Sequence, residues 1–421
     1  MKNPADYIRV KLPLAETLPL KTDVFIVGGG PAGLATAIAA RQKGFRVSIA
    51  DSSIPPVDKA CGEGLMPDGI VALRELGVTI PADQRFPFRG IRFVEGDLAA
   101  QSDFSNERGW GIRRTTLHTA LAERAAALGV EMYWGKRVIG LNGGLNGNNS
   151  ENGEQHGGIF LEGRAIRARW IIGADGQNSR VRQWAQFTPA RKKGLRYGFS
   201  SHFQTTPWSD YVEVHWAPNC QIYITPIGRQ EICVAVLTAN PRSRLADVLK
   251  FFPSVAKRLK HAVALTPEMG GVSSSLSMAE VTRKSAVPVA LIGDASGSVD
   301  AIAGEGLTLA FRQALALGEA LERNDLAAYE VEHRRGRKRP VMMSRLLVTL
   351  SDHSRLRHRV LSAFASEPSL FSRLLAAHTG AAISPWMALQ TMCFLGWKIL
   401  NPQKTAKSIR AAHEPAVSQP G

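Results

Sequence analysis

The sequence predicts an α/β fold, α+β overall, in which a parallel sheet assembled from separate chain segments is interrupted by an antiparallel sheet. Three observations predict it. Apolar runs ending in glycine turns recur at residues 23–28, 168–176 and 288–297, as expected of buried parallel strands. Between the last two runs, residues 211–216, 220–228 and 231–237 alternate in the manner of antiparallel strands. Beyond Pro340 the chain is helical in pattern and basic.

The first segment forms a complete strand–helix–strand unit. Residues 23–28 (DVFIVG) predict a buried strand, residues 31–43 a helix, and the sequence RVSIAD after Gly44 a second strand that ends at Asp51. Further along, KRVIGL and IFLEG alternate like strands on either side of residues 142–158, which are rich in glycine and asparagine. We expect a long exposed hairpin loop there.

The turn of this first unit carries a GxGxxG fingerprint, formed by Gly28, Gly30 and Gly33. In a Rossmann-like unit the first glycine allows the tight turn, the second lets the backbone approach a pyrophosphate, and the third permits close helix–strand packing. The helix N-terminus, with Ala32 in its first turn, offers free N–H groups to the anion. Asp51 stands where a carboxylate accepts hydrogen bonds from ribose hydroxyls. The pattern predicts a bound dinucleotide.

Two later turns extend the pattern. GADG, with Asp175, follows one predicted strand, and GDASG, with Asp294, follows another. Gly304, Glu305 and Gly306 then precede an apolar helix that begins near Leu307. Such a helix start can direct backbone N–H groups at a phosphate or at a flavin ring.

With these segments the chain resembles the flavoprotein superfamily that contains para-hydroxybenzoate hydroxylase and the geranylgeranyl reductases. The matching stretches are GGGPAG with Asp51, GIRRTTLHTAL, GADGQNSRVR and GDASGSVDAIAGEGL, which together span roughly residues 22–335. The resemblance implies FAD as cofactor. It also implies that Arg114 contacts the flavin, that Val138 offers backbone to the adenine, that Asp294 binds the ribityl chain, and that Asp175 serves both FAD and NAD(P)H.

The stretch KACGEGLMPDG resembles the CGxG segment of geranylgeranyl reductase-like proteins, in which the cysteine lies near the isoalloxazine. Cys61 is then either a small buried apolar group or a group beside flavin or substrate, and Glu63 is a candidate acid or base. Para-hydroxybenzoate-type hydroxylases usually carry histidine where Gly297 stands and proline where Ala301 stands. The halogenase signature WxWxIP is also missing from this sequence. These departures favour the reductase-like branch.

The domain organisation follows from these segments. We expect an FAD-binding domain formed by residues 1–85, 105–190 and 276–335, a substrate domain formed by residues 86–104 and 191–275, and a C-terminal helical region at 336–421. His202, Tyr211, His215, Trp216 and Tyr223 lie on the inserted strands and are candidates to line a substrate pocket. The C-terminal helices are expected either to pack on the substrate domain or to act as a lid or docking face.

Composition sets further limits. Hydrophobic residues make up 44% of the chain and charged residues 21%, which is typical of a globular protein and not of a disordered one. Four scattered cysteines without a CxxC pair suggest neither a metal site nor disulfides. The N-terminus lacks the apolar region of a signal peptide, and no apolar run is long enough to span a bilayer, so a cytoplasmic protein is expected.

The formal charge of +16 indicates either attraction to an anionic partner or a solubilising surface. Nine Lys or Arg against two acids in residues 331–360 form either a solvated helix face or a docking face for an acidic partner or anionic lipid. An acidic carrier or electron-transfer protein and peripheral membrane contact are both open; no nucleic acid is expected.

For function, we expect an FAD-dependent monooxygenase that hydroxylates a small or carrier-bound organic substrate, since the resemblance implies that many reductase-like members serve biosynthetic tailoring. The alternative is a reductase of carbon–carbon double bonds, in which Cys61 and Glu63 would be the catalytic candidates. A third reading is a non-catalytic flavin-binding protein that docks a partner. Because a second GxGxxG is missing from the sequence, reducing equivalents are expected from transient NAD(P)H or from a partner protein.

Overall fold

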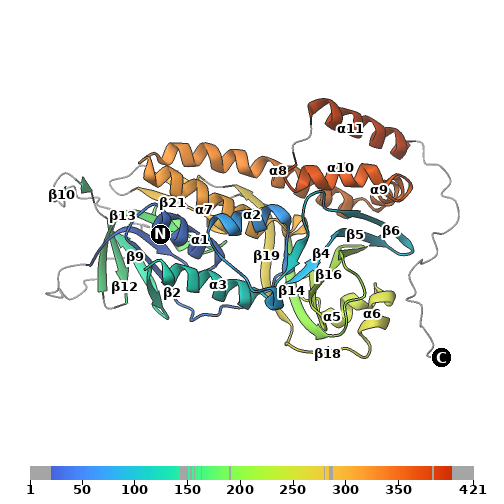
Figure 1. Ribbon diagram of the computed structural model, residues 1–421, viewed down its shortest axis with the longest axis horizontal. Coiled ribbons are helices and arrows are strands. Elements are labelled where there is room, and N and C mark those ends of the chain that lie inside the picture. Colours follow the sequence, from blue (N-terminus) through green and yellow to red (C-terminus); the bar gives the residue numbers. More distant parts are fainter. Residues whose placement is uncertain are drawn as a thin grey trace, which may run out of the picture.

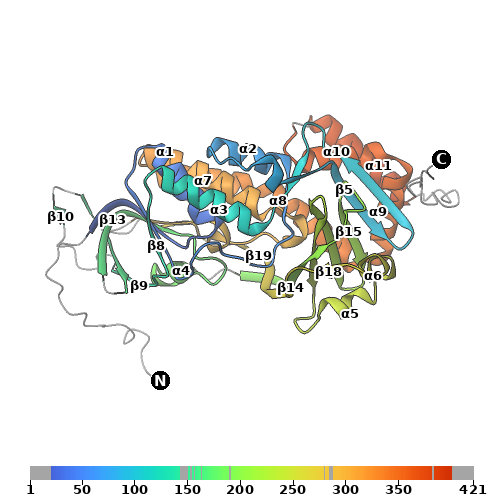
Figure 2. The same cartoon turned by 60° about the horizontal axis from the view of Figure 1, so that its bottom comes forward.

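The computed structural model describes residues 20–142, 150–151, 154–155, 157–162, 164–188, 191–278, 280–283, 288–381 and 384–400. Two large sheets lie side by side along its long axis, and helices α7 and α8 run along the first of them (Figure 1). Helices near the C-terminus cover the second sheet (Figure 2).

The first sheet has the parallel core that the sequence predicts. Its main path runs β20-β21-β13-β1-β2-β8, and every neighbouring pair from β21 to β8 is parallel. Strand β20 adds to its edge antiparallel, and β12 and β9 continue from β13 as an antiparallel pair. The strands are β1 Leu20–Val27, β2 Val47–Asp51, β8 Glu131–Trp134, β9 Val138–Asn142, β12 Gly157–Leu161, β13 Arg164–Gly173, β20 Thr282–Arg283 and β21 Val289–Leu291.

The predicted hairpin at residues 142–158 is confirmed by the pairing of β9 with β12, while most of its loop lies outside the described residues. Within it, β10 (Ser150–Glu151) pairs antiparallel with β11 (Glu154–Gln155).

Helices α1 (Pro31–Gln42), α3 (Arg114–Ala127) and α7 (Gly306–Glu322) pack together over the first sheet, beside α2 (Pro67–Glu75) (Figure 2). Nine of the twelve residues of α1 are buried, because α1 lies between the sheet and α7. Small side chains permit the close contact: a Cβ on Gly318 of α7 would stand 3.2 Å from the Cβ of Ala39 in α1. This layer forms the largest apolar core.

The second sheet has the order β18-β14-β17-β16-β15-β5-β6, with β19 paired to β14. Two of its strands come from an earlier part of the chain, and β5 joins β15 in parallel. Because apolar side chains cover both faces, all six residues of β15 are buried. The elements are β5 Gly90–Glu95, β6 Leu98–Asp103, β14 Arg191–Gln204, β15 Val212–Ala217, β16 Cys220–Gly228, β17 Glu231–Thr238, β18 Val263–Ala264, β19 Met269–Met278, α5 Leu245–Leu249 and α6 Pro253–Leu259.

Between the two large sheets lies a small three-stranded sheet of order β3-β7-β4, formed by β3 (Gly64–Leu65), β7 (Gly109–Gly111) and β4 (Phe86–Phe88). Short 3₁₀ turns complete the chain at η2 Ala82–Gln84, η3 Gly293–Ser296, η4 Ala301–Ala303, and a short helix α4 spans Arg180–Trp184.

The C-terminal helices are α8 (Leu326–Asp352), α9 (Ser354–Ser366), α10 (Pro368–His378) and α11 (Pro385–Leu400). The expected domain boundary after Arg335 falls inside α8, which continues unbroken through Pro340. Helix α8 packs on α7 at one end and on α9 and α10 at the other, and the predicted division into domains stays a prediction. In the part of the chain that the structure describes, the helices are all too short or too polar to cross a membrane.

Buried basic residues of α8 tie it to the loops at the end of the first sheet. The Arg337 guanidinium donates to the carbonyl oxygens of Gly297, Ser277 and Ser298, and His333 Nε2 bonds Ser296 Oγ at 2.9 Å. Burial lowers the pKa of His333 to about 3, so this imidazole is neutral at physiological pH. Helix α8 therefore fixes the loop of residues 296–298.

Replacing Arg337 by methionine would remove the guanidinium donor from three buried carbonyls, of which that of Ser298 keeps a hydrogen bond from Ser277 N. We expect Arg337→Met to lower the free energy of unfolding by about 2–4 kcal/mol, measured by denaturant unfolding. The matched control is Arg334→Met on the exposed side of the same helix, where an ion pair with Glu330 is lost at a cost of about 0.5 kcal/mol. Equal losses in the two variants would contradict the assigned role of Arg337.

Candidate functional site

The glycines of the first turn fall into two groups. Gly28 has φ +109°, and a Cβ there would stand 2.4 Å from the carbonyl oxygen of Ala174. A Cβ on Gly33 would stand 1.8 Å from the Gly28 oxygen. At Gly30, by contrast, a Cβ would meet nothing within 4 Å. Two of the predicted glycines thus serve internal packing, and Gly30 faces open space at the N-terminus of α1.

That open space fits an anionic ligand. Because the first N–H groups of a helix have no partner within the helix, those of Ala32 and Gly33 are oriented toward it. Gly293 of the GDASG turn lies against the same helix end: its Cβ would stand 2.8 Å from the Cβ of Ala32. The GGGPAG and GDASG turns, which are far apart in sequence, therefore lie next to each other at the start of α1.

Asp51 stands at the end of β2, as predicted, and its carboxylate is held by backbone. Oδ2 accepts from Gly29 N at 2.7 Å, and Oδ1 accepts from Ser53 N at 2.7 Å. The sequence pattern did not single out Gly29, although a Cβ there would stand 2.2 Å from the Trp134 ring. It also missed His118, whose Nε2 bonds the Gly29 oxygen at 2.9 Å and whose pKa is lowered by burial.

Asp294 and Arg114 lie close enough for the charge of Arg114 to act on the Asp294 carboxyl group. Asp294 is accessible to solvent, yet protein atoms surround it closely enough that burial raises the pKa of its carboxyl group while Arg114 opposes the rise. Accessibility combined with close enclosure is expected of a group that a ligand can reach. The Nε of Arg114 is buried and has no hydrogen-bond partner among the described residues. Both groups are thus available to a ligand.

The turn before α7 has the backbone features that the sequence predicts. Gly304 has φ +67°, a left-handed conformation that favours glycine, and a Cβ on Gly306 would meet nothing within 4 Å. Leu307 follows in the first turn of α7 and contributes to a pocket.

Val138 and Asp175 are among the predicted residues that do not line that pocket. Val138 begins β9 and is buried, just after Lys136, whose N–H donates to the Asp51 carbonyl. Asp175 Oδ2 caps α4 by accepting from Arg180 N and Val181 N, which leaves Oδ1 buried and unpartnered. Their predicted contacts with adenine and with NAD(P)H stay predictions.

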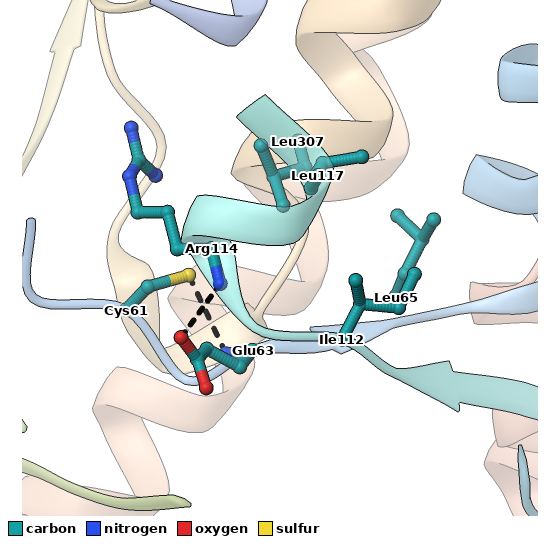
Figure 3. Close-up of a pocket in the computed structure, with 7 residues that line it drawn as sticks. All are labelled: Cys61, Glu63, Leu65, Ile112, Arg114, Leu117 and Leu307. Carbon is teal, nitrogen blue, oxygen red and sulfur yellow. Dashed lines mark hydrogen bonds between the residues drawn. The ribbon is translucent and has the colours of Figure 1, made fainter. Parts of the chain in front are cut away.

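The pocket holds about 240 Å³ of free space, part of it open to solvent. Apolar side chains form one side and polar groups the other, as Figure 3 shows. Its lining residues are Cys61, Glu63, Leu65, Ile112, Arg114, Leu117 and Leu307. Both catalytic candidates of the sequence thus meet the flavin-site residues Arg114 and Leu307.

Glu63 is the most constrained residue in the pocket. It is buried and has φ +56°, which is unusual for a residue with a side chain. Its Oε1 accepts from Arg114 N at 2.7 Å, and its Oε2 stands 2.8 Å from His202 Nε2. On the far side of the ring, His202 Nδ1 lies 2.9 Å from Thr266 Oγ1. A strained, buried carboxylate paired with a histidine is typical of a functional site.

Cys61 lies beside this pair as a protonated thiol. Its Sγ accepts from Glu63 N at 3.4 Å, and burial raises the pKa of the thiol, so it is a poor nucleophile at neutral pH. Cys233 Sγ donates to the Cys61 oxygen at 3.3 Å, and burial raises its pKa as well. Among the described residues, Glu63, His202 and Cys233 are close enough to hold a metal. The hydrogen bond between Glu63 and His202 and the protonated thiol of Cys233 indicate a proton-bonding cluster instead.

The other candidates on the inserted strands are not brought to this pocket. His215 Nε2 bonds Glu213 Oε2 at 2.9 Å inside the second sheet, and the Tyr211 hydroxyl donates to Asp103. Trp216 packs in the core under α9 and α10, and the Tyr223 hydroxyl donates to the Ile302 oxygen at 3.2 Å.

Comparison with known proteins agrees with this geometry. The family model described as FAD binding domain matches residues 21–324. The menaquinone reductase of Mycolicibacterium smegmatis is 26% identical over 307 residues, covering 68% of this chain and 73% of that protein. The rifampicin monooxygenase of Streptomyces venezuelae is 30% identical over 173 residues, covering 38% of this chain and 33% of that protein.

A solved flavoprotein/dehydrogenase structure from Cytophaga hutchinsonii superposes with a TM-score of 0.75 at 20% identity, covering 91% of this chain and all of that one (100%). The resemblance to the superfamily that includes the geranylgeranyl reductases, and the predicted fold class, are thereby confirmed.

The two groups of glycines should respond differently to an added methyl group. Gly30→Ala should leave the melting temperature of the apoprotein unchanged and weaken FAD binding at least about tenfold, a loss of about 1.4 kcal/mol. Gly33→Ala should itself lower the melting temperature of the apoprotein, because its Cβ overlaps backbone, at a cost of about 1–3 kcal/mol.

Calorimetry of the apoproteins and FAD titration would measure both effects. Gly336→Ala is the control, since a Cβ at that position of α8 also meets nothing within 4 Å. A large drop in apoprotein stability for Gly30→Ala would show that Gly30 is a packing residue like Gly33.

Proposed function

Because this chain belongs to the FAD-binding-domain family and is an FAD-dependent oxidoreductase, we propose that it reduces a carbon–carbon double bond in an apolar substrate. The observation that carries the proposal is the buried Glu63–His202 pair at the pocket. The matched relatives are enzymes, which sets aside a purely non-catalytic flavin-binding protein.

The predicted flavin-site residues would hold FAD as follows. The N-terminus of α1 at Gly30 and Ala32 would bind the pyrophosphate, and Asp51 would orient the adenosine ribose. Asp294, Arg114 and the N-terminus of α7 at Gly306 would bind the flavin half. When bound, FAD supplies a hydride equivalent to the substrate.

Saturating a double bond needs one proton for each hydride, and the Glu63–His202 pair is placed to supply it. The proton is held between Glu63 Oε2 and His202 Nε2, which are 2.8 Å apart. Both side chains are buried, and Glu63 lines the pocket. Arg114 N fixes the other oxygen of Glu63, so the carboxyl group keeps its orientation after the proton leaves. The Thr266 hydroxyl holds the far nitrogen of the ring in the same way.

The side chains that line the pocket indicate the chemical class of the substrate. Its apolar side consists of Leu65, Ile112, Leu117 and Leu307, which favours an isoprenoid, a quinone or an acyl chain over a charged molecule. The match to the menaquinone reductase supports this choice, because it covers 68% of this chain and 73% of that protein.

For the source of electrons we propose transient docking of NAD(P)H. The sequence contains one GxGxxG turn, at Gly28 to Gly33, so a separate stable site of that kind is not expected. The net charge of +16 would accelerate the encounter with an anionic dinucleotide or with an acidic electron carrier.

Monooxygenation of an organic substrate is the second candidate. It is favoured by the 30% identity to the rifampicin monooxygenase, although that match covers only 38% of this chain. Gly297 and Ala301 stand where para-hydroxybenzoate-type hydroxylases usually carry histidine and proline, which argues against hydroxylation of that type.

The mass of the product separates the two candidates. A reductase should form a product heavier by two hydrogens, with turnover under anaerobic conditions when NAD(P)H is supplied. A screen of isoprenoid and quinone substrates followed by mass spectrometry would measure it. A product heavier by one oxygen, formed only in air, would establish the monooxygenase instead.

Removing the acid of the pair should slow the reduction of substrate. We expect Glu63→Gln to lower the rate of substrate-dependent flavin reoxidation by about a hundredfold or more, while reduction of the flavin by NAD(P)H stays unchanged. Stopped-flow absorbance would follow the two half-reactions separately.

The matched control is Glu213→Gln, which breaks a second buried Glu–His pair, at 2.9 Å from His215 and outside the pocket. If both variants slow substrate reduction equally, the role assigned to Glu63 fails, because loss of a buried ion pair would then account for the effect.

A further inference from the structure

Helix α11 presents an unusual apolar surface. Of the sixteen large hydrophobic residues that are exposed in the described parts of the chain, seven lie on this one helix. Trp386 is 67% exposed, Trp397 50% and Leu400 77%. In Figures 1 and 2, α11 lies at the outer edge of the molecule, beyond α9 and α10.

The helical spacing places these residues on one outward face. Trp386, Leu389, Cys393, Trp397 and Leu400 recur every three or four residues and are all exposed. The opposite face carries Leu395 and Ile399, which pack against the apolar core that α9 and α10 share with the second sheet. The helix is therefore apolar on both sides, and only the inner side is accounted for by the fold.

Helix α11 carries a cation beside its exposed rings and belongs to a basic part of the chain. Lys398 Nζ lies 5.6 Å from the centre of the Phe394 ring and 5.9 Å from that of Trp397. On α9 and α10, Arg355, Arg359 and Arg373 are exposed, and the single acid in α9 to α11 is Glu367. Residues 326–400 contain eleven Lys or Arg against four Asp or Glu.

We propose that the outward face of α11 docks this enzyme onto the surface of an anionic phospholipid bilayer. Tryptophan is favoured at the boundary between lipid headgroups and acyl chains, where its ring is partly apolar and its N–H can hydrogen-bond. Leu389 and Leu400 enter the acyl region, and the basic residues of the C-terminal helices contact lipid phosphates. With sixteen residues the helix is about 24 Å long, shorter than the roughly 30 Å hydrocarbon core, so it lies in the interface.

A second copy of the chain fits this face less well. A symmetric dimer through α11 would bring together two copies of the strongly basic C-terminal helices, and like charges close together repel. The surface of an anionic bilayer can bury the apolar face and attract the basic residues of these helices at the same time. The inference goes beyond the proposed reaction and does not depend on it.

Vesicle flotation of the full-length FAD-bound protein tests the proposal. The probes are vesicles of phosphatidylcholine alone and of phosphatidylcholine with phosphatidylglycerol at roughly three to one. We expect binding to the anionic vesicles, weaker binding at high salt, and a blue shift of tryptophan fluorescence. The double variant Trp386→Ser, Trp397→Ser should bind at least about a hundredfold more weakly, or about tenfold for each ring removed from the interface.

The control is Phe251→Ser, which removes an aromatic ring of similar exposure, 60%, between α5 and α6. It should bind vesicles like the parent protein, and FAD absorbance should show that all variants are folded. Absence of binding to anionic vesicles, or equal binding by the double variant, would overturn the proposal. So would a concentration-dependent dimer in sedimentation velocity that the double variant abolishes, because the face would then be a self-contact.

Discussion

The hydrogen bonds around residues 61–63 join the two halves of the molecule. From the second sheet, Ser200 Oγ accepts from Cys61 N, Thr225 Oγ1 donates to the Gly62 oxygen, and His202 bonds the Glu63 carboxylate. From the side of the first sheet, Ile112 N donates to the Glu63 oxygen and Arg114 N to its side chain. The short CGE segment is thus bonded on both sides, which explains how a backbone with φ +56° at Glu63 is maintained. The position of the pocket depends on this connection.

A second connection comes from α8. Its buried Arg337 and His333 hold the loop of residues 296–298, which follows the predicted flavin-site residue Asp294. The same helix continues to α9 and α10, which close the apolar core beneath the second sheet. The C-terminal helices are consequently part of the framework that positions the flavin-site turns, as well as a cover for the sheet.

Two of the buried Glu–His pairs show how position determines what such a pair can do. Glu63–His202 and Glu213–His215 have nearly the same separation, 2.8 and 2.9 Å. The first opens on a pocket with apolar walls, whereas the second also accepts from Trp208 within the sheet. Only the first can exchange a proton with a bound molecule. Chemical type alone would not have distinguished them.

The sequence by itself determined the features that depend on neighbouring residues. The turn at Gly28 to Gly33, the acid at Asp51 and the glycines before α7 are local patterns, because a turn and a helix start are set by a few consecutive residues. The sequence also identified Cys61 and Glu63 as candidates, because their segment resembles the CGxG stretch of geranylgeranyl reductase-like proteins. Tertiary structure alone decided that His202, which is 139 positions from Glu63, completes the acid pair. Tertiary structure also decided that α8 continues through the expected boundary. It decided as well that α11 has an apolar face on the outside, because an apolar helix pattern does not specify which side the rest of the protein will cover.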